Sequence, residues 1–140
     1  MKKTRLLSLF VIVAMVLAVS CGKKSNDANT TAPAPVQLTG TPAQNMITVM
    51  EMGVNALKNN SDAAVAASAL KKIMADYNIE QLRAASKAAK DAGQGATDEE
   101  KARFQSLQDE YKALATQVGS QNPGAFNEAH ADWSRAWGIN

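Results

Sequence analysis

The sequence predicts an all-α protein: a small antiparallel up-and-down bundle of about four helices on a disordered N-terminal tether. After Pro42, apolar residues recur every three or four positions, and no segment shows the alternation of a half-buried strand. Short polar or glycine-containing stretches separate the helical segments, and short connections favour antiparallel neighbours. We therefore expect three parts: residues 1–20, residues 21–41 and a folded domain over residues 42–140.

The first predicted helix begins at Pro42 and ends at Asn59 and Asn60. Thr41 and Gln44 have the spacing of a capping box, and proline is favoured at the first helical position. The inward face of this helix should supply core contacts through Met46, Val49, Met50, Gly53, Val54 and Leu57.

The second predicted helix begins near Asp62 and is kinked or broken near Asn78. Before that point its apolar face holds Ala66, Leu70, Ile73 and Tyr77. Beyond it the stripe moves to Ile79, Leu82, Ala85 and Ala89. A straight helix would place Lys72 on the same face as Ile79, so we expect an interruption and then helix again to about Ala92.

Two further helices are predicted, one before and one after Asn122. Thr97 and Glu100 form a second capping box, ahead of the most regular stripe in the chain: Phe104, Leu107, Tyr111, Leu114 and Val118. Gly119 is expected to end this helix, and Asn122 is expected to cap the last one. One face of the last helix holds Phe126, Ala129, His130, Trp133 and Trp137.

Residues 1–20 have the pattern of a secretory signal peptide. The segment Met1–Arg5 carries three positive charges and no acid, and an apolar run from Leu6 to Val19 follows, interrupted only by Ser8. This run is shorter than the roughly 20 apolar residues that a transmembrane helix needs. We therefore expect a leader that is removed, not a membrane-spanning anchor.

The cleavage region reads Leu17-Ala18-Val19-Ser20-Cys21, which resembles the lipobox of bacterial lipoproteins, although Ala18 stands where that family most often has leucine. The resemblance implies that Cys21, the only cysteine, receives a diacylglycerol on its sulfur and that cleavage occurs before it. The lipid would then hold the protein on a membrane. Gly22 replaces the aspartate that retains family members at the inner membrane, which implies the outer membrane, facing the periplasm, if the host has two membranes. Ordinary secretory cleavage after Ser20 is the alternative.

Without the leader the chain is almost neutral, because 15 basic residues become 12 against 13 acidic ones. No basic stripe remains to follow a phosphate backbone, so we expect no nucleic-acid partner. Residues 22–41 contain only Val36 and Leu38 as large apolar residues, too few to bury a core. We expect this segment to be a flexible tether with a span of about 25 Å.

Recognised catalytic motifs are absent from the sequence, and no cysteine follows Cys21 to form a thiolate site. We therefore expect a non-enzymatic protein without a resident cofactor, which binds a partner protein in the cell envelope or has a structural role there. Trp133 and Trp137, one helical turn apart, either fill the core or form a patch for such a partner. A carrier that holds a small molecule between its helices is a further hypothesis.

His130, the only histidine, suggests a second function. Met46 and Met50 lie on the inner face of the first helix, and the first and last helices are neighbours in an up-and-down bundle of four. A methionine and His130 could therefore meet across the core. The alternative is a partly buried histidine bonded to a carbonyl or water, beside methionines that fill space.

The succession of Asn45-Met46, Ser61-Asp62-Ala63-Ala64 and Ala69-Leu70-Lys71-Lys72 resembles cytochrome b562, a periplasmic four-helix bundle. In that family an early methionine of the first helix and a histidine of the last helix bind haem. The resemblance implies that Met46 and His130 are the haem ligands of this chain, with Met50 as the other candidate for the methionine. It therefore implies a haem b electron carrier. The chain departs from the family in its shorter last helices and in a histidine that lies well before the C-terminus. The same pair of ligands would also suit Cu(I).

Overall fold

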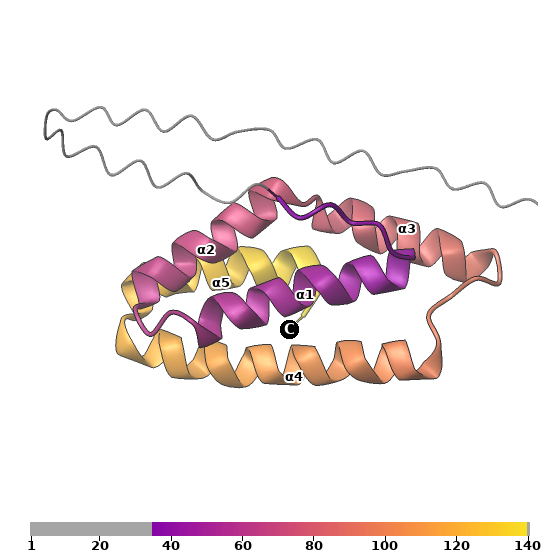
Figure 1. Cartoon of the computed structure of the whole chain (residues 1–140). Coiled ribbons are helices and arrows are strands. Elements are labelled where there is room, and N and C mark those ends of the chain that lie inside the picture. Colours follow the sequence, from indigo (N-terminus) through magenta and orange to yellow (C-terminus); the bar gives the residue numbers. More distant parts are fainter. Residues whose placement is uncertain (1–34, 140) are drawn as a thin grey trace, which may run out of the picture. The chain divides into compact units, whose positions relative to one another are not determined.

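The computed structural model describes residues 35–139, which form five α-helices and no strand (Figure 1). The helices are α1 (Pro42–Lys58), α2 (Ala63–Asp76), α3 (Ile79–Asp91), α4 (Asp98–Gln121) and α5 (Pro123–Trp137). The predicted all-α class is confirmed, but there are five helices where about four were expected. The predicted signal peptide, Cys21 and the first part of the tether lie outside the described residues. None of the described helices is long and apolar enough to cross a bilayer.

The fifth helix arises from a full break between α2 and α3. Tyr77 has an extended backbone, with φ −129° and ψ 123°, so the helix cannot continue through it. Asn78 then caps α3, because its side-chain oxygen accepts a hydrogen bond of 2.9 Å from the backbone N–H of Gln81. The shift of the apolar stripe near Asn78 therefore marks two separate helices.

Local sequence sets the other helix ends. Both predicted capping boxes form, at Thr41 with Gln44 and at Thr97 with Glu100. Gly119 does not end α4 as predicted: the helix continues to Gln121. The boundary falls at Asn122 because it precedes Pro123, and a residue before proline is disfavoured in the helical conformation.

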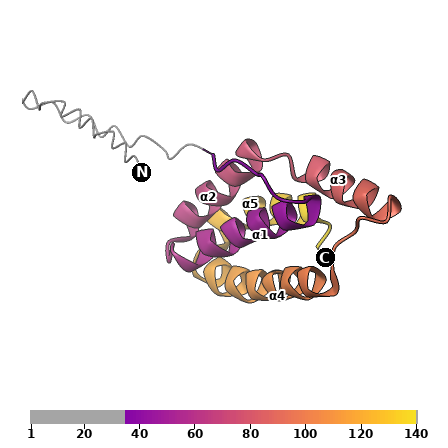
Figure 2. The same cartoon turned by 45° about the vertical axis from the view of Figure 1, so that its right-hand side comes forward.

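The closest helix pairs run parallel and are not adjacent in the sequence. Ion pairs join Glu51 of α1 to Arg103 of α4 and Lys58 of α1 to Glu110 of α4. From the first pair to the second, both helices advance by seven residues, so α1 and α4 run in the same direction. α2 packs in the same way on α5, with Lys71 paired to Glu128 at 2.5 Å. Figures 1 and 2 both show α4 on the far side of α1 from α3, reached by the loop over residues 92–97. α1 and α5 are therefore not packed side by side as expected, but face each other across the core, where Trp133 of α5 contacts Gly53 of α1.

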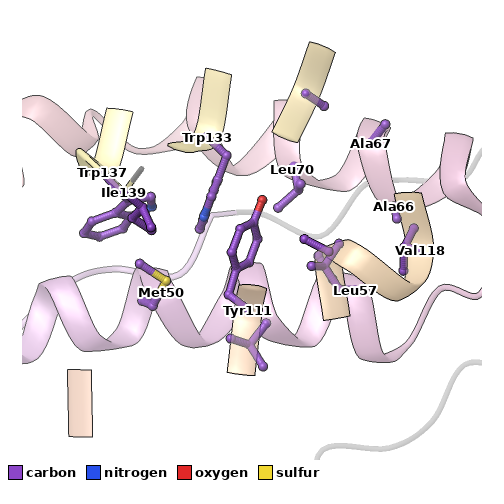
Figure 3. Close-up of a cluster of buried hydrophobic side chains, with 14 of the residues drawn as sticks. Met50, Leu57, Ala66, Ala67, Leu70, Tyr111, Val118, Trp133, Trp137 and Ile139 are labelled. Atoms are coloured by element: carbon purple, nitrogen blue, oxygen red, sulfur yellow. The ribbon is translucent and has the colours of Figure 1, made fainter. Parts of the chain in front are cut away.

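The core is built around aromatic side chains from α4 and α5. Trp133, Tyr111 and Phe126 are almost fully buried, together with Met50 of α1 and Leu70 of α2 (Figure 3). On the α2 side, the small residues Ala63, Ala66 and Ala67 are buried and let that helix approach closely. All buried apolar side chains of the described chain belong to this one cluster.

Residues 35–41 pack on the helices, although the folded domain was predicted to begin at Pro42. The hydroxyl of Tyr77 donates a hydrogen bond of 3.0 Å to the carbonyl oxygen of Val36, and Leu38 packs against the core. This segment therefore crosses the break between α2 and α3 (Figure 2).

Candidate functional site

His130 lies where α5 faces α4, and its contacts are with aromatic residues. Its Nδ1 is 3.1 Å from the hydroxyl oxygen of Tyr111, and its ring stacks on Phe126 with centroids 5.7 Å apart. Burial raises the pKa of Tyr111 and lowers the pKa of His130, so both groups are neutral near pH 7. This geometry agrees with a packed, hydrogen-bonded histidine, and its partner is a hydroxyl in place of the expected carbonyl or water.

The structure does not bring Met46 or Met50 to His130. Met46 lines a surface slot together with Phe104, whereas His130 contacts Tyr111, which lies seven residues further along α4. Seven residues of helix span about 10 Å, too far for two ligands of one metal. Met50 is buried at the same end of the core as Trp137 and Ile139 (Figure 3). The proposed haem or Cu(I) ligand pair is therefore not assembled.

Residues 35–139 contain no cluster of the side chains that usually bind metal ions. No group of three or more histidine, cysteine, aspartate or glutamate side chains lies close enough together in this range to hold an ion. The described residues thus offer no ligand cluster of the usual composition.

Trp133 and Trp137 are part of the core and cannot form a partner patch on the surface. Their side chains are 0% and 4% exposed, and their rings lie 5.8 Å apart with Tyr111 stacked against Trp133. The Nε1 atoms of both indoles are buried without a hydrogen-bond partner among the described residues. The two rings act mainly as apolar filling between α1 and α5.

An apolar slot lies between α1, α3 and α4. Met46 and Ile47 of α1 and Phe104 of α4 line it, with Ser86 of α3 on the opposite wall and Ala43, Ala96, Glu100 and Lys101 around them. Its volume is about 180 Å³. Met46, Ile47 and Phe104 are half-buried, so the slot exposes apolar side chains that no other element within residues 35–139 covers.

The slot opens onto a second hollow, which we call the lysine mouth. It is lined by Lys87 and Lys90 of α3 and by Lys101 of α4, with Ser86, Gly93, Gly95 and Ala96 between them. Its volume is about 630 Å³, and it shares Ser86, Ala96 and Lys101 with the slot. Lys101 donates to Asp98 at 2.8 Å, and this hydrogen bond lowers the pKa of Asp98. We refer to the slot and the mouth together as the groove.

The groove exists because α3 carries too little side-chain volume beyond Leu82. Its predicted inward positions are Ala85 and Ala89, yet Ala85 is exposed and Ala89 only half-buried. Ile79 is the single buried residue of this helix. Sequence reasoning missed the groove, although the run of small residues before Gly93-Gln94-Gly95 was the available signal.

Comparison with models of known protein families, with curated proteins and with solved structures finds no match for this chain.

Proposed function

We propose that this chain is an exported lipoprotein, anchored through Cys21, whose helical domain binds a ligand in the cell envelope at the groove. In a host with two membranes, Gly22 favours the outer membrane, with the domain in the periplasm. On this proposal the protein has no catalytic role and the groove is its working surface.

The observation that carries the binding role is the apolar slot. The side chains of Met46, Ile47 and Phe104 are half-buried and face solvent between α1, α3 and α4, which do not cover them. Binding sites for small molecules are typically concave and mostly apolar, with a few polar groups that fix the orientation of the ligand. The slot has this composition, with Ser86, Glu100 and Lys101 as its polar groups.

Anchoring is tested by replacing the lipidated residue. Cys21→Ala should release the protein from membranes into the soluble fraction, because no acyl chain is then attached. Ser25→Ala, four residues away, is the matched control and should remain with the membranes. Mass spectrometry that finds an unmodified sulfur at Cys21 in the wild-type protein would refute the lipoprotein proposal.

Binding at the groove is tested by a photo-crosslinking amino acid in living cells. Placed at Ser86 it lies in the groove, whereas at Val65, which is 50% exposed on α2, it lies outside it. We expect a discrete adduct from position 86 and none from position 65. Equal labelling at both positions, or no adduct at position 86, would contradict a binding role for the groove.

A further inference from the structure

We infer that the groove binds a long-chain carboxylate, with its apolar chain in the slot and its acidic head at the lysine mouth. This inference rests on the proposed function and names the ligand class for the same site.

The shape of the slot favours a single slender chain. Its volume of about 180 Å³ lies below the roughly 300 Å³ at which ordinary small-molecule sites begin. Two acyl chains side by side would exceed this volume, whereas one alkyl chain can lie along Met46, Ile47 and Phe104. Each methylene buried there should tighten binding by up to about fourfold until the slot is full.

The charge of the mouth favours an acidic head. Three lysines line it, and no carboxylate is among its lining residues. Lys90 forms no ion pair within residues 35–139, while Lys87 and Lys101 pair with Asp91 and Asp98. Ion pairs as exposed as these two are weak, so both lysines can turn toward a bound anion at little cost.

Glu100 sets the direction in which such a ligand enters. Its carboxylate lines the slot and is held in place because it accepts a hydrogen bond of 2.9 Å from the backbone N–H of Thr97. A second carboxylate within the slot would be repelled by it. The acidic head is therefore kept at the mouth, and the chain enters the slot from that side.

The test uses residues 21–140 with Cys21→Ala, without detergent, and decanoate, hexanoate and decanol as probes in calorimetry. The whole described core lies within this chain. We expect decanoate to bind with one-to-one stoichiometry, more tightly than hexanoate or decanol. Trp137 packs on Phe104 with ring centroids 5.5 Å apart, so its fluorescence should change on binding.

Lysine substitutions distinguish the contribution of the acidic head to binding from that of the alkyl chain. Changing Lys87, Lys90 and Lys101 together to glutamine should weaken decanoate binding roughly tenfold and leave decanol binding unchanged. The matched control changes Lys58, Lys71 and Lys72, which lie outside the groove, and should alter neither ligand. Ser86→Trp, which fills the slot, should abolish binding of both. Circular dichroism establishes that each variant is folded.

Two outcomes would overturn the inference. If decanol binds as tightly as decanoate, the slot takes apolar chains but the mouth does not select an anion. If decanoate does not bind while the adduct at position 86 still forms in cells, the groove has another ligand and the proposed function stands. Failure of the adduct itself would instead remove the proposed function.

Discussion

Gly53 is the residue on which the approach of α1 to α5 depends. The indole of Trp133 crosses the core from α5 and lies against the backbone of α1 at this position. A Cβ placed on Gly53 would overlap Cζ2 of Trp133 and lie 2.6 Å from its Cη2. Because the ring is fully buried and flanked by Tyr111 and Trp137, it has no free space into which to move.

We predict that Gly53→Ala destabilises the protein by about 1–2 kcal/mol, because an overpacking cost of about 2–3 kcal/mol outweighs the roughly 1 kcal/mol that alanine gains over glycine within a helix. Urea unfolding measures the change. Gly119→Ala is the matched control, since its Cβ would meet Phe126 at an ordinary contact distance of 3.4 Å. That variant should be neutral or up to about 1 kcal/mol more stable. Equal effects of the two substitutions would show that Trp133 does not require the glycine.

The pair of His130 and Tyr111 predicts a dependence of stability on pH. Burial lowers the pKa of His130 below its ordinary value of 6.5, so the unfolded chain binds a proton more readily than the folded one. The free energy of unfolding is therefore highest above pH 6.5. It decreases as the pH falls through 6.5 toward the lower pKa that His130 has in the folded state. The loss should be at most about 1 kcal/mol, because the ring is only half-buried.

Measuring the free energy of unfolding between pH 7.5 and 5.5 tests this prediction. His130→Gln cannot take up the proton, so its stability should change less over the same range. A wild-type protein whose pH dependence matches that of His130→Gln would show that this histidine is not perturbed.

At the scale of whole elements, the segment over residues 35–41 acts as part of the fold. It contributes the hydrogen bond between Tyr77 and Val36 and the packing of Leu38. A chain that begins at Gly40, which keeps the Thr41 cap of α1, should therefore be about 1–3 kcal/mol less stable than one that begins at Pro35. Thermal unfolding of the two chains gives the difference. If their midpoints coincide, the segment is not a structural part of the domain.

Helix ends and inward faces could be predicted from the sequence because they depend on nearby residues. Capping boxes involve side chains three residues apart, and the shift of the stripe near Asn78 is visible without knowledge of the fold. The extension of α4 past Gly119 was not foreseen, since a glycine can remain helical when the next strong stop lies at Asn122 and Pro123.

The pairing of helices and the groove could not be predicted in the same way. Each amphipathic stripe can pack against any other, so nothing local distinguishes α4 from α5 as the partner of α1. The contact of His130 with Tyr111 depends on the register of two helices, which only the assembled core fixes. The small residues of α3 beyond Leu82 are visible in the sequence, but the hollow that they leave depends on how α1, α3 and α4 pack.

At the scale of the whole molecule, α5 completes the core and supplies four of its buried side chains: Phe126, Ala129, Trp133 and Trp137. A chain that stops at Gln121 would leave Tyr111 and Leu70 facing water. We predict that it has no cooperative unfolding transition and binds hydrophobic dyes, because it loses a stabilisation comparable with the 5–15 kcal/mol by which proteins are usually stable. A sharp calorimetric transition for this chain would contradict the prediction.

The parallel pairing of α1 with α4 and of α2 with α5 has a consequence for the order in which the molecule can form. During synthesis α1 leaves the ribosome long before its main partner, α4, has been made. α2 likewise emerges long before its main partner, α5. The first half of the polypeptide can form only the contacts among α1, α2 and α3, and it lacks the main partners of α1 and α2. The aromatic core can therefore be completed only after α4 and α5 have left the ribosome.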